Sequence, residues 1–387
     1  MQNLRPALLY SAKTALAAFA ALGISLAVGL PMPFWAMTTV YITSNPLSGA
    51  TRSKSIYRVL GTTLGAAVAV ALVPALVDWP ALLSLALSLW VGACLVVSLL
   101  DRSPRAYVMM LAGYTAAIIG FSSVDHPEAI FDTASARVTE IVLGIACVTV
   151  SHSLFWPLSV GQRLGPKLHV WMHDAETWLR DAMAGRPEAL KDRRKLAIDA
   201  LDCIILATHV PYDTSHWREA TRVVQSMLYR MLLLMPLLSG IVDRRRALGE
   251  DAEMAEAGAR TEAWLDAGMP ADAVPDYLRH IPPERDWQGL LRESFLVRLA
   301  QTTRILSECR QMLHRLDNPE VPLPEDLVIE KVPLKLHTDF QFAVLAGLSC
   351  SFALMLVCTF WIWTGWVDGA AAAAMTAVFC CLFAAMD

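Results

Sequence analysis

The chain has 387 residues, of which 55% are hydrophobic and only 18% are charged, against roughly 25% charged residues in an average soluble domain. This balance favours a protein that is solvated by lipid. The formal net charge of -4 gives no basic field of the kind that nucleic-acid binding requires, so no nucleic-acid partner is expected.

Apolar segments dominate the first 160 positions. A membrane-spanning helix needs about 20 mostly apolar residues, and six candidates are separated by short polar or proline-containing breaks. We expect these spans near residues 12–31, 34–48, 57–77, 81–100, 105–122 and 134–156. Two further apolar segments are expected near residues 340–360 and 369–386. The sequence therefore predicts an all-α integral membrane protein.

The predicted loops alternate in charge. Lys and Arg occur in every second loop, at Arg52, Lys54, Arg58, Arg102, Arg105, Arg163 and Lys167. The intervening loops contain neither Lys nor Arg; their marked residues are Pro31 and Pro33, then Asp78, then Asp125, Glu128 and Asp132. By the positive-inside rule, the N-terminus and the region after the sixth span are predicted to be cytoplasmic, in a protein of the bacterial inner membrane.

Most of the Lys and Arg residues fall between positions 161 and 336. Apolar residues recur there with helical periodicity, as at Leu164, Leu168, Trp171, Ala175, Trp178 and Leu179. We expect a soluble helical bundle in this region. The predicted organisation is a first transmembrane module of six spans at 1–160, a cytoplasmic helical domain at 161–336, and the start of a second transmembrane module with two spans at 337–387.

The run from Met227 to Val242 is also apolar, but Arg230 and Pro236 interrupt it. Apolar runs of this length are usually core helices of soluble domains. We therefore expect a buried helix of the bundle here and not a ninth span.

Two segments of the chain resemble each other. The sequence FWAMTTVY at 34–41 has an echo in AMTAVF at 374–379, and each follows a long apolar segment and a Trp-containing turn. Internal repeats that flank a binding site are common in transporters. The chain is expected to begin a second copy of its first module.

The sequences PFWAMTTVYITSNP at 33–46 and TRSKSIYRVLGTTLG at 51–65 resemble the fusaric acid resistance family, which includes bacterial aromatic acid exporters. The resemblance extends over essentially the whole chain. It implies export of aromatic carboxylic acids or related toxic organic anions across the inner membrane, often beside a periplasmic adaptor protein. Members of that family carry a complete second module, so this sequence is expected to be a fragment or a shortened variant that ends early in that module.

The second predicted span is short and polar, and a short, proline-interrupted span is a sequence pointer to a substrate site. Thr38, Thr39 and Asn45 lie in it ahead of Pro46, which has no backbone N–H to donate. Tyr41 offers a ring that an aromatic substrate could stack on. The hydroxyl groups could equally bond to their own helix or to a neighbouring one, and the sequence leaves both interpretations open.

A basic cluster follows this span, formed by Arg52, Lys54 and Arg58. An organic anion that arrives from the cytoplasm would be attracted to it. Charges that only fix membrane topology would look the same. Arg58 is the preferred candidate of the three, because it stands at the entrance of the third span.

Two further pairs of polar residues were weighed as sites. Arg137 and Glu140 lie three positions apart in the sixth span, which favours a structural pair, although Glu140 is also a candidate carrier of a coupling proton. His169 and His173 are one helical turn apart, but no third ligand has a convincing spacing, so neither a metal site nor a cofactor is predicted.

The leading hypothesis is a secondary exporter of organic acids that is coupled to a proton gradient, since the sequence contains no GxxxxGK[ST] phosphate loop. One alternative is a passive anion channel. Another is a membrane-anchored assembly or envelope-stress protein. No enzyme is expected and no catalytic residues are assigned. The incomplete second module is expected to leave helix faces that contact lipid or a second copy in a homo-oligomer.

Overall fold

The structure, a computed structural model, describes residues 4–155, 157–186, 189–249, 252–277, 286–325, 327–329 and 338–384. These residues form α-helices, short 3-10 turns and loops, with no β-strand among them. The predicted all-α class is confirmed. The last two positions of the predicted segment at 369–386 lie outside the described residues.

The chain forms two compact units. The first, called here the membrane unit, combines residues 1–158 with residues 335–387, and the second, called the central unit, comprises residues 159–334. The helices of the membrane unit are α1 (Leu4–Val28), α2 (Phe34–Thr43), α3 (Ser48–Leu76), α4 (Pro80–Leu100), α5 (Ala106–Ser122), α6 (Ile130–Leu154), α12 (Phe340–Thr364) and α13 (Gly369–Ala384). Of these helices, α1, α3, α4, α6 and α12 are long and apolar enough to cross a membrane, and α5 and α13 are shorter apolar helices.

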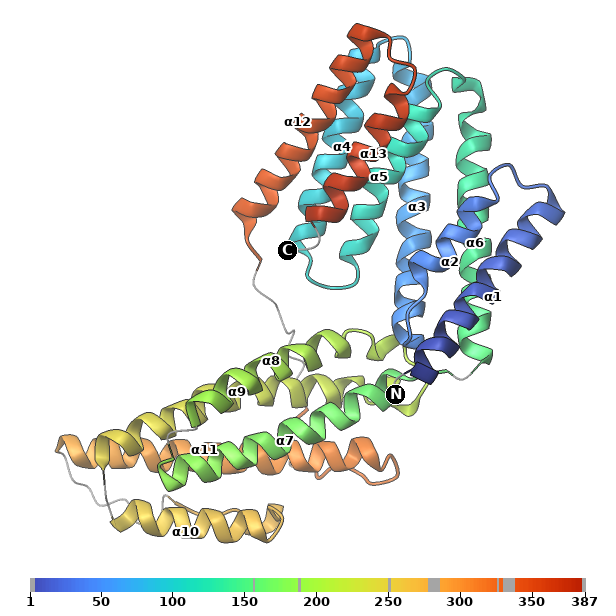
Figure 1. Cartoon of the computed structure of the whole chain (residues 1–387). Coiled ribbons are helices and arrows are strands. Elements are labelled where there is room, and N and C mark those ends of the chain that lie inside the picture. The colour runs from blue at the N-terminus through green and yellow to red at the C-terminus, as the bar shows by residue number, and fades with distance from the viewer. Residues whose placement is uncertain are drawn as a thin grey trace. The chain divides into compact units, whose positions relative to one another are not determined.

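The helices of the membrane unit pack in two groups that meet at α3. In one group α12 packs against α4, while α13 and α3 both pack against α5 (Figure 1). In the other group α1 and α2 pack against α6, which also packs against α3. The C-terminal helices, drawn in red in Figure 1, therefore join a bundle that is built mainly from the first part of the chain.

Helix α2 is shorter than the span predicted at 34–48. Its ten residues extend for about 15 Å, half of the roughly 30 Å of a hydrocarbon core. The helix ends at Thr43 because Asn45 precedes Pro46, and the residue before a proline is biased away from helical backbone angles. The Asn45 side chain then accepts a hydrogen bond from the backbone N–H of Leu47 at 3.0 Å, which forms a tight turn into α3.

Two glycines let α3 approach α5 closely. A Cβ atom added at Gly61 would lie 2.6 Å from the carbonyl oxygen of Val108, and one added at Gly65 would lie 2.6 Å from the carbonyl oxygen of Ala112. Real carbon and oxygen atoms do not approach so closely, so only glycine fits at these two positions. Pairs of small residues four positions apart allow this kind of contact between helices in lipid, where dispersion forces and not the hydrophobic effect hold helices together.

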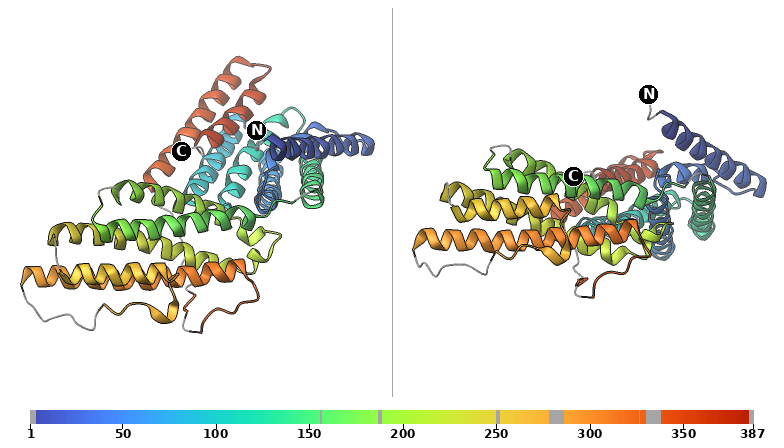
Figure 2. Two further views of the ribbon diagram at one scale, coloured as in Figure 1. Left: turned by 60° about the horizontal axis from the view of Figure 1, so that its bottom comes forward. Right: turned by 90° about the horizontal axis from the view of Figure 1, so that it is seen from below.

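The central unit is built from α7 (Val160–Ala184), α8 (Ala189–Ala207), α9 (Thr221–Leu248), α10 (Ala252–Asp266) and α11 (Trp287–Asp317). Helices α7, α8, α9 and α11 run alongside one another (Figure 2). The large side chains of Trp171, Trp178 and Phe295 are fully buried among them. A capping box of Ser159 and Gln162 fixes the start of α7.

Helix α9 is long and apolar enough to cross a membrane, but it packs within the helical bundle of the central unit. It contacts α7, α8 and α11, and Leu234, Leu238 and Ile241 are fully buried. Arg230 in the middle of the helix forms an ion pair with Glu308 of α11 at 2.6 Å. The neighbouring helices thus account for its apolar stripe without lipid.

The two cysteines of the central unit are buried. Burial raises the pKa of the Cys203 thiol to about 11 and that of the Cys309 thiol to about 12. Both therefore stay protonated at neutral pH, where a thiol is a poor nucleophile.

The contact between α3 and α5 can be tested with Gly65→Leu. We expect a loss of at least about 1–3 kcal/mol in the free energy of unfolding, because the new side chain would overlap the backbone of α5. The thermal unfolding midpoint of the purified protein in detergent measures the effect. The matched control is Gly23→Leu, since a Cβ at Gly23 meets nothing within 4 Å. Equal midpoints for the two variants would contradict the close packing.

Candidate functional site

The membrane unit contains a cavity of about 880 Å³ between α2, α3, α5, α6 and α13. Most of its wall is apolar or aromatic. The lining residues of this kind are Phe34, Trp35, Ile42, Tyr107, Met110, Tyr114, Ile118, Val367, Ala370, Ala371, Ala374, Met375, Val378 and Leu382. A volume of this size accommodates a small organic molecule.

Charges of one sign dominate the polar part of the wall. Three cationic side chains line the cavity, Lys54, Arg58 and Arg137, against the single carboxylate of Asp368. Lys54 and Arg58 come from the first half of α3, one helical turn apart, and Arg137 comes from α6. The lining residues therefore carry an excess of two positive charges.

Arg58 is held in place by two hydroxyl groups. Its Nη1 donates to the Tyr107 hydroxyl at 2.9 Å, and its Nη2 is 3.4 Å from the Thr39 hydroxyl. The side chain is only 5% exposed, and its Nε is buried without a hydrogen-bond partner among the described residues. Both partners are neutral, so the guanidinium charge is oriented but not neutralised.

Arg137 is buried in a different way. Its side chain is 7% exposed, and its guanidinium carbon lies 3.1 Å from the centroid of the Trp35 ring. This contact is a cation–π interaction, which attracts the charge but leaves the N–H groups available for other acceptors. Its Nε also lacks a hydrogen-bond partner within the described part of the chain.

The expected pairing of Arg137 with Glu140 does not occur, since no ion pair of the described residues joins the two side chains. Glu140 instead accepts a hydrogen bond at its Oε1 from the backbone N–H of Met32 at 2.6 Å. It is fully buried, and its Oε2 has no hydrogen-bond partner in the described ranges. The loop between α1 and α2 thus holds the carboxylate, while Arg137 faces the cavity.

The structure brings together four of the candidates from the sequence. Thr38, Lys54 and Arg58 line the cavity. Thr39 accepts a hydrogen bond from Arg58. Tyr41, Asn45 and Arg52 are not among the residues that line it. Tyr41 is 52% exposed, and Asn45 forms the turn between α2 and α3.

Buried cations beside an apolar space determine what this cavity can bind. An unpaired charge that is removed from water costs several kcal/mol unless a partner of opposite charge is supplied. A carboxylate between Arg58 and Arg137 would provide that partner and accept charge-assisted hydrogen bonds. The aromatic wall would cover the body of the same molecule. The arrangement suits an organic anion.

The family assignment rests on most of the chain. The Fusaric acid resistance protein family matches it over residues 7–387. The chain belongs to this family. The resemblance first noted at residues 33–65 is confirmed, and those residues form α2 and the part of α3 that carries Lys54 and Arg58.

Several curated proteins are similar to the chain. The p-hydroxybenzoic acid efflux pump subunit AaeB of Musicola paradisiaca is 26% identical, and the match covers 96% of this chain and 58% of that protein. The uncharacterized transporter YdhK of Escherichia coli is 28% identical, with 97% of this chain and 57% of that protein covered. The chain thus spans a little over half the length of these curated relatives.

Two residues that line the cavity, Trp35 and Arg137, are not among the substrate-path candidates from the sequence. Arg137 was interpreted as a structural partner of Glu140, although an ionisable residue inside an apolar span marks a functional site by default. Trp35 lies next to the polar residues of the short second span, and its ring lies under the Arg137 guanidinium. The contribution of α13 could have been suspected from the echo of residues 34–41 at 374–379, since both segments lie on helices that line the cavity.

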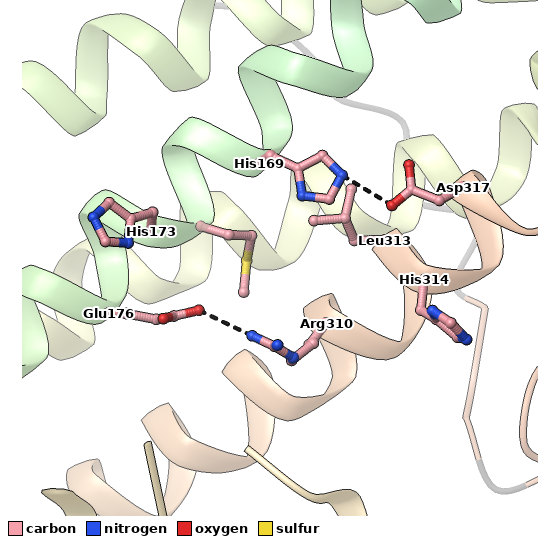
Figure 3. Close-up of a pocket in the computed structure, with 8 residues that line it drawn as sticks. His169, His173, Glu176, Arg310, Leu313, His314 and Asp317 are labelled. Carbon is pink, nitrogen blue, oxygen red and sulfur yellow. Dashed lines mark hydrogen bonds and ion pairs between the residues drawn. The ribbon is translucent and has the colours of Figure 1, made fainter. Parts of the chain in front are cut away.

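A polar cleft of about 300 Å³ between α7 and α11 of the central unit contains both histidines that were considered as metal ligands (Figure 3). His169 Nε2 lies 2.9 Å from an Asp317 carboxylate oxygen, and Glu176 pairs with Arg310 at 3.4 Å. Within the described residues, no group of three or more His, Cys, Asp or Glu side chains could hold a metal ion. Both carboxylates that line this cleft thus have a partner in it.

Access to the membrane cavity can be tested with single cysteines. Thr38→Cys and Met375→Cys should react with a small water-soluble maleimide, because both side chains are exposed in the cavity wall. Val148→Cys should not react, since Val148 is fully buried between α1, α2 and α6. Labelling is measured by mass spectrometry against the unsubstituted chain. Failure of both cavity positions to react would show that the cavity is closed to water.

Proposed function

We propose that the protein exports aromatic carboxylates or related organic anions across the bacterial inner membrane through the cavity of the membrane unit. The observation that carries the proposal is a pair of buried guanidinium groups, Arg58 and Arg137, in the wall of an aromatic-lined cavity. The Nε of each has no hydrogen-bond partner among the residues that the structure describes. Membership of a family with efflux pump subunits among its relatives supports transport over catalysis.

The cavity offers different partners to the two ends of such a substrate. The carboxylate would lie between Arg58 and Arg137 and accept hydrogen bonds from them. The ring would contact Phe34 and Tyr114, which line the same space. Aromatic rings attract one another by about 0.5–1.5 kcal/mol beyond the area that they bury. This contribution of the rings to binding is modest. A modest affinity suits export, because the substrate must also dissociate.

The charge pattern of the loops supports an orientation of the membrane unit in which the basic loops face the cytoplasm. Lys54 and Arg58 stand at the start of α3, close to the end of the unit where the basic loops occur. With that side in the cytoplasm, as the positive-inside rule requires, the N-terminus and the central unit are cytoplasmic and the basic end of the cavity meets substrate first. We keep the division into modules at 1–160, 161–336 and 337–387 as part of this proposal.

Two partners belong to the proposal. The word subunit in the name of a relative fits a multi-component pump, and a periplasmic adaptor protein would continue the export path. The exposed apolar faces of the membrane unit, such as that of α12, fit contacts with lipid and with a second copy in a homo-oligomer. Neither partner alters the assignment of the cavity.

The first test measures retention of a labelled aromatic carboxylate in cells that lack their own exporters. Expression of the chain should lower retention, and Arg58→Gln or Arg137→Gln should reduce the export rate at least about ten-fold, since one charge-assisted hydrogen bond is lost from the bound anion. Arg102→Gln is the matched control, because this exposed arginine does not line the cavity.

Membrane insertion of every variant is checked by its amount in the membrane fraction. Export at the normal rate by both cavity variants would refute the cavity as the substrate path. Loss of export by Arg102→Gln as well would show that the positive charge at this membrane face matters and not the cavity.

We further propose that Glu140 carries the proton that couples export to the proton gradient. It is fully buried, and Oε2 has no hydrogen-bond partner among the described residues, so it can accept a proton without breaking a bond. Glu140→Gln should preserve substrate binding but abolish the acceleration of export by an imposed pH gradient in proteoliposomes. The exposed Glu128 provides the control, Glu128→Gln. Electrical current that needs no gradient and survives Glu140→Gln would instead indicate a passive anion channel.

A further inference from the structure

The central unit has a groove of about 560 Å³ between α9 and α11. Its apolar part is formed by Leu233 and Leu237 of α9 and by Ile305 of α11, with Tyr229 at one side. Leu233 is 37% exposed, which is unusual for a leucine in the interior of a bundle. A small molecule with an apolar body would cover this surface.

The polar part of the groove has more positive than negative charge. Among its lining residues are Arg230, Arg298 and Arg304, with Glu308 as the single carboxylate. Arg230 Nε donates to one Glu308 oxygen at 2.6 Å, and Arg304 Nε donates to the other at 3.1 Å. One carboxylate therefore serves two guanidinium groups.

The hydrogen-bond donors of Arg230 are already bound to acceptors within the central unit. Besides Glu308, its guanidinium donates to the Ser226 hydroxyl at 2.6 Å and to the Val328 carbonyl oxygen at 2.9 Å. It is 6% exposed and links α9, α11 and the segment 327–329. We assign it to the architecture of the groove and not to ligand binding.

Arg298 differs from Arg230, because its Nε is buried and has no hydrogen-bond partner in the described part of the chain. Its side chain lies beside Gly240 of α9, where an added Cβ would be 3.0 Å from Arg298 Cδ. The glycine leaves room for the arginine at the edge of the groove. Arg298 and Arg304 stand six positions apart on α11, and both line the groove with Gln301 between them.

We propose that this groove is a second binding site for a small organic anion, in which Arg298 and Arg304 hold the acidic group and the leucine surface holds the apolar body. The excess of two positive charges among the lining residues favours an anionic ligand, and the apolar surface favours one with an apolar body over inorganic phosphate. The site lies within the central unit and is independent of the membrane cavity. It would let the central unit respond to the concentration of organic acids.

The experiment uses the full chain in detergent with Gln301→Cys as a reporter, since Gln301 is an exposed residue of the groove. The rate of labelling by a neutral maleimide is measured with and without naphthoate, and the unsubstituted chain corrects for native cysteines. Naphthoate should slow labelling, whereas the neutral isostere naphthamide should not. Adding Arg298→Gln should weaken the protection about ten-fold, since a charge-assisted hydrogen bond is lost.

Two controls separate this site from other effects. Arg310→Gln removes one exposed arginine of the same helix outside the groove and should leave protection unchanged. Arg58→Gln disables the membrane cavity and should also leave it unchanged, so that failure of the proposed export function would not be mistaken for failure here. Arg298→Lys should retain part of the protection if charge is what binds.

Three results would overturn the proposal. Absence of protection by naphthoate up to its solubility limit, in a chain whose Gln301→Cys reacts normally, would show that the groove binds no such anion. Equal protection by naphthamide would remove the role of charge. Slow labelling without ligand that speeds up on dilution would show that a second copy of the chain occupies the groove.

Discussion

The arrangement of the membrane unit depends on two buried guanidinium groups and on the side chains that surround them. Arg58 and Arg137 lie among apolar helices, and the described structure gives them hydroxyl groups and an indole ring but no carboxylate within ion-pair distance. A cation in this position is tolerated only when neutral dipoles orient it and a mobile counter-charge can reach it. In the proposed function, the cavity beside the two groups is the route by which that counter-charge arrives.

Close packing brings together the helices α3 and α5 beside the cavity. Gly61 and Gly65 bring α3 against α5, and this places Arg58 within hydrogen-bonding distance of Tyr107. The early end of α2 at Thr43 has a similar effect, because the turn formed by Asn45 leads directly into the basic start of α3. Residues that contact no substrate thus determine where the charges lie.

The cleft and the groove of the central unit differ in how their charged side chains are paired. In the cleft of His169 and Arg310, both carboxylates have a partner, since Asp317 contacts His169 and Glu176 pairs with Arg310. The groove of Arg298 is lined by three arginines and one carboxylate, Glu308, which pairs with Arg230 and Arg304. The Nε of Arg298 has no hydrogen-bond partner among the described residues. The same imbalance of charge marks the membrane cavity, although the two sites share no residue.

The sequence by itself determined the helical class, the positions of most apolar helices and the basic cluster at the start of α3, because lipid imposes length and hydropathy on each span separately. It also pointed to Thr38, Thr39, Lys54 and Arg58, which are close together along the chain. Only the tertiary structure brought Arg137 and the C-terminal helix α13 to the same cavity. Which face of a helix packs against which neighbour depends on the packing of side chains across the whole unit. The hydropathy of a single segment does not predict it.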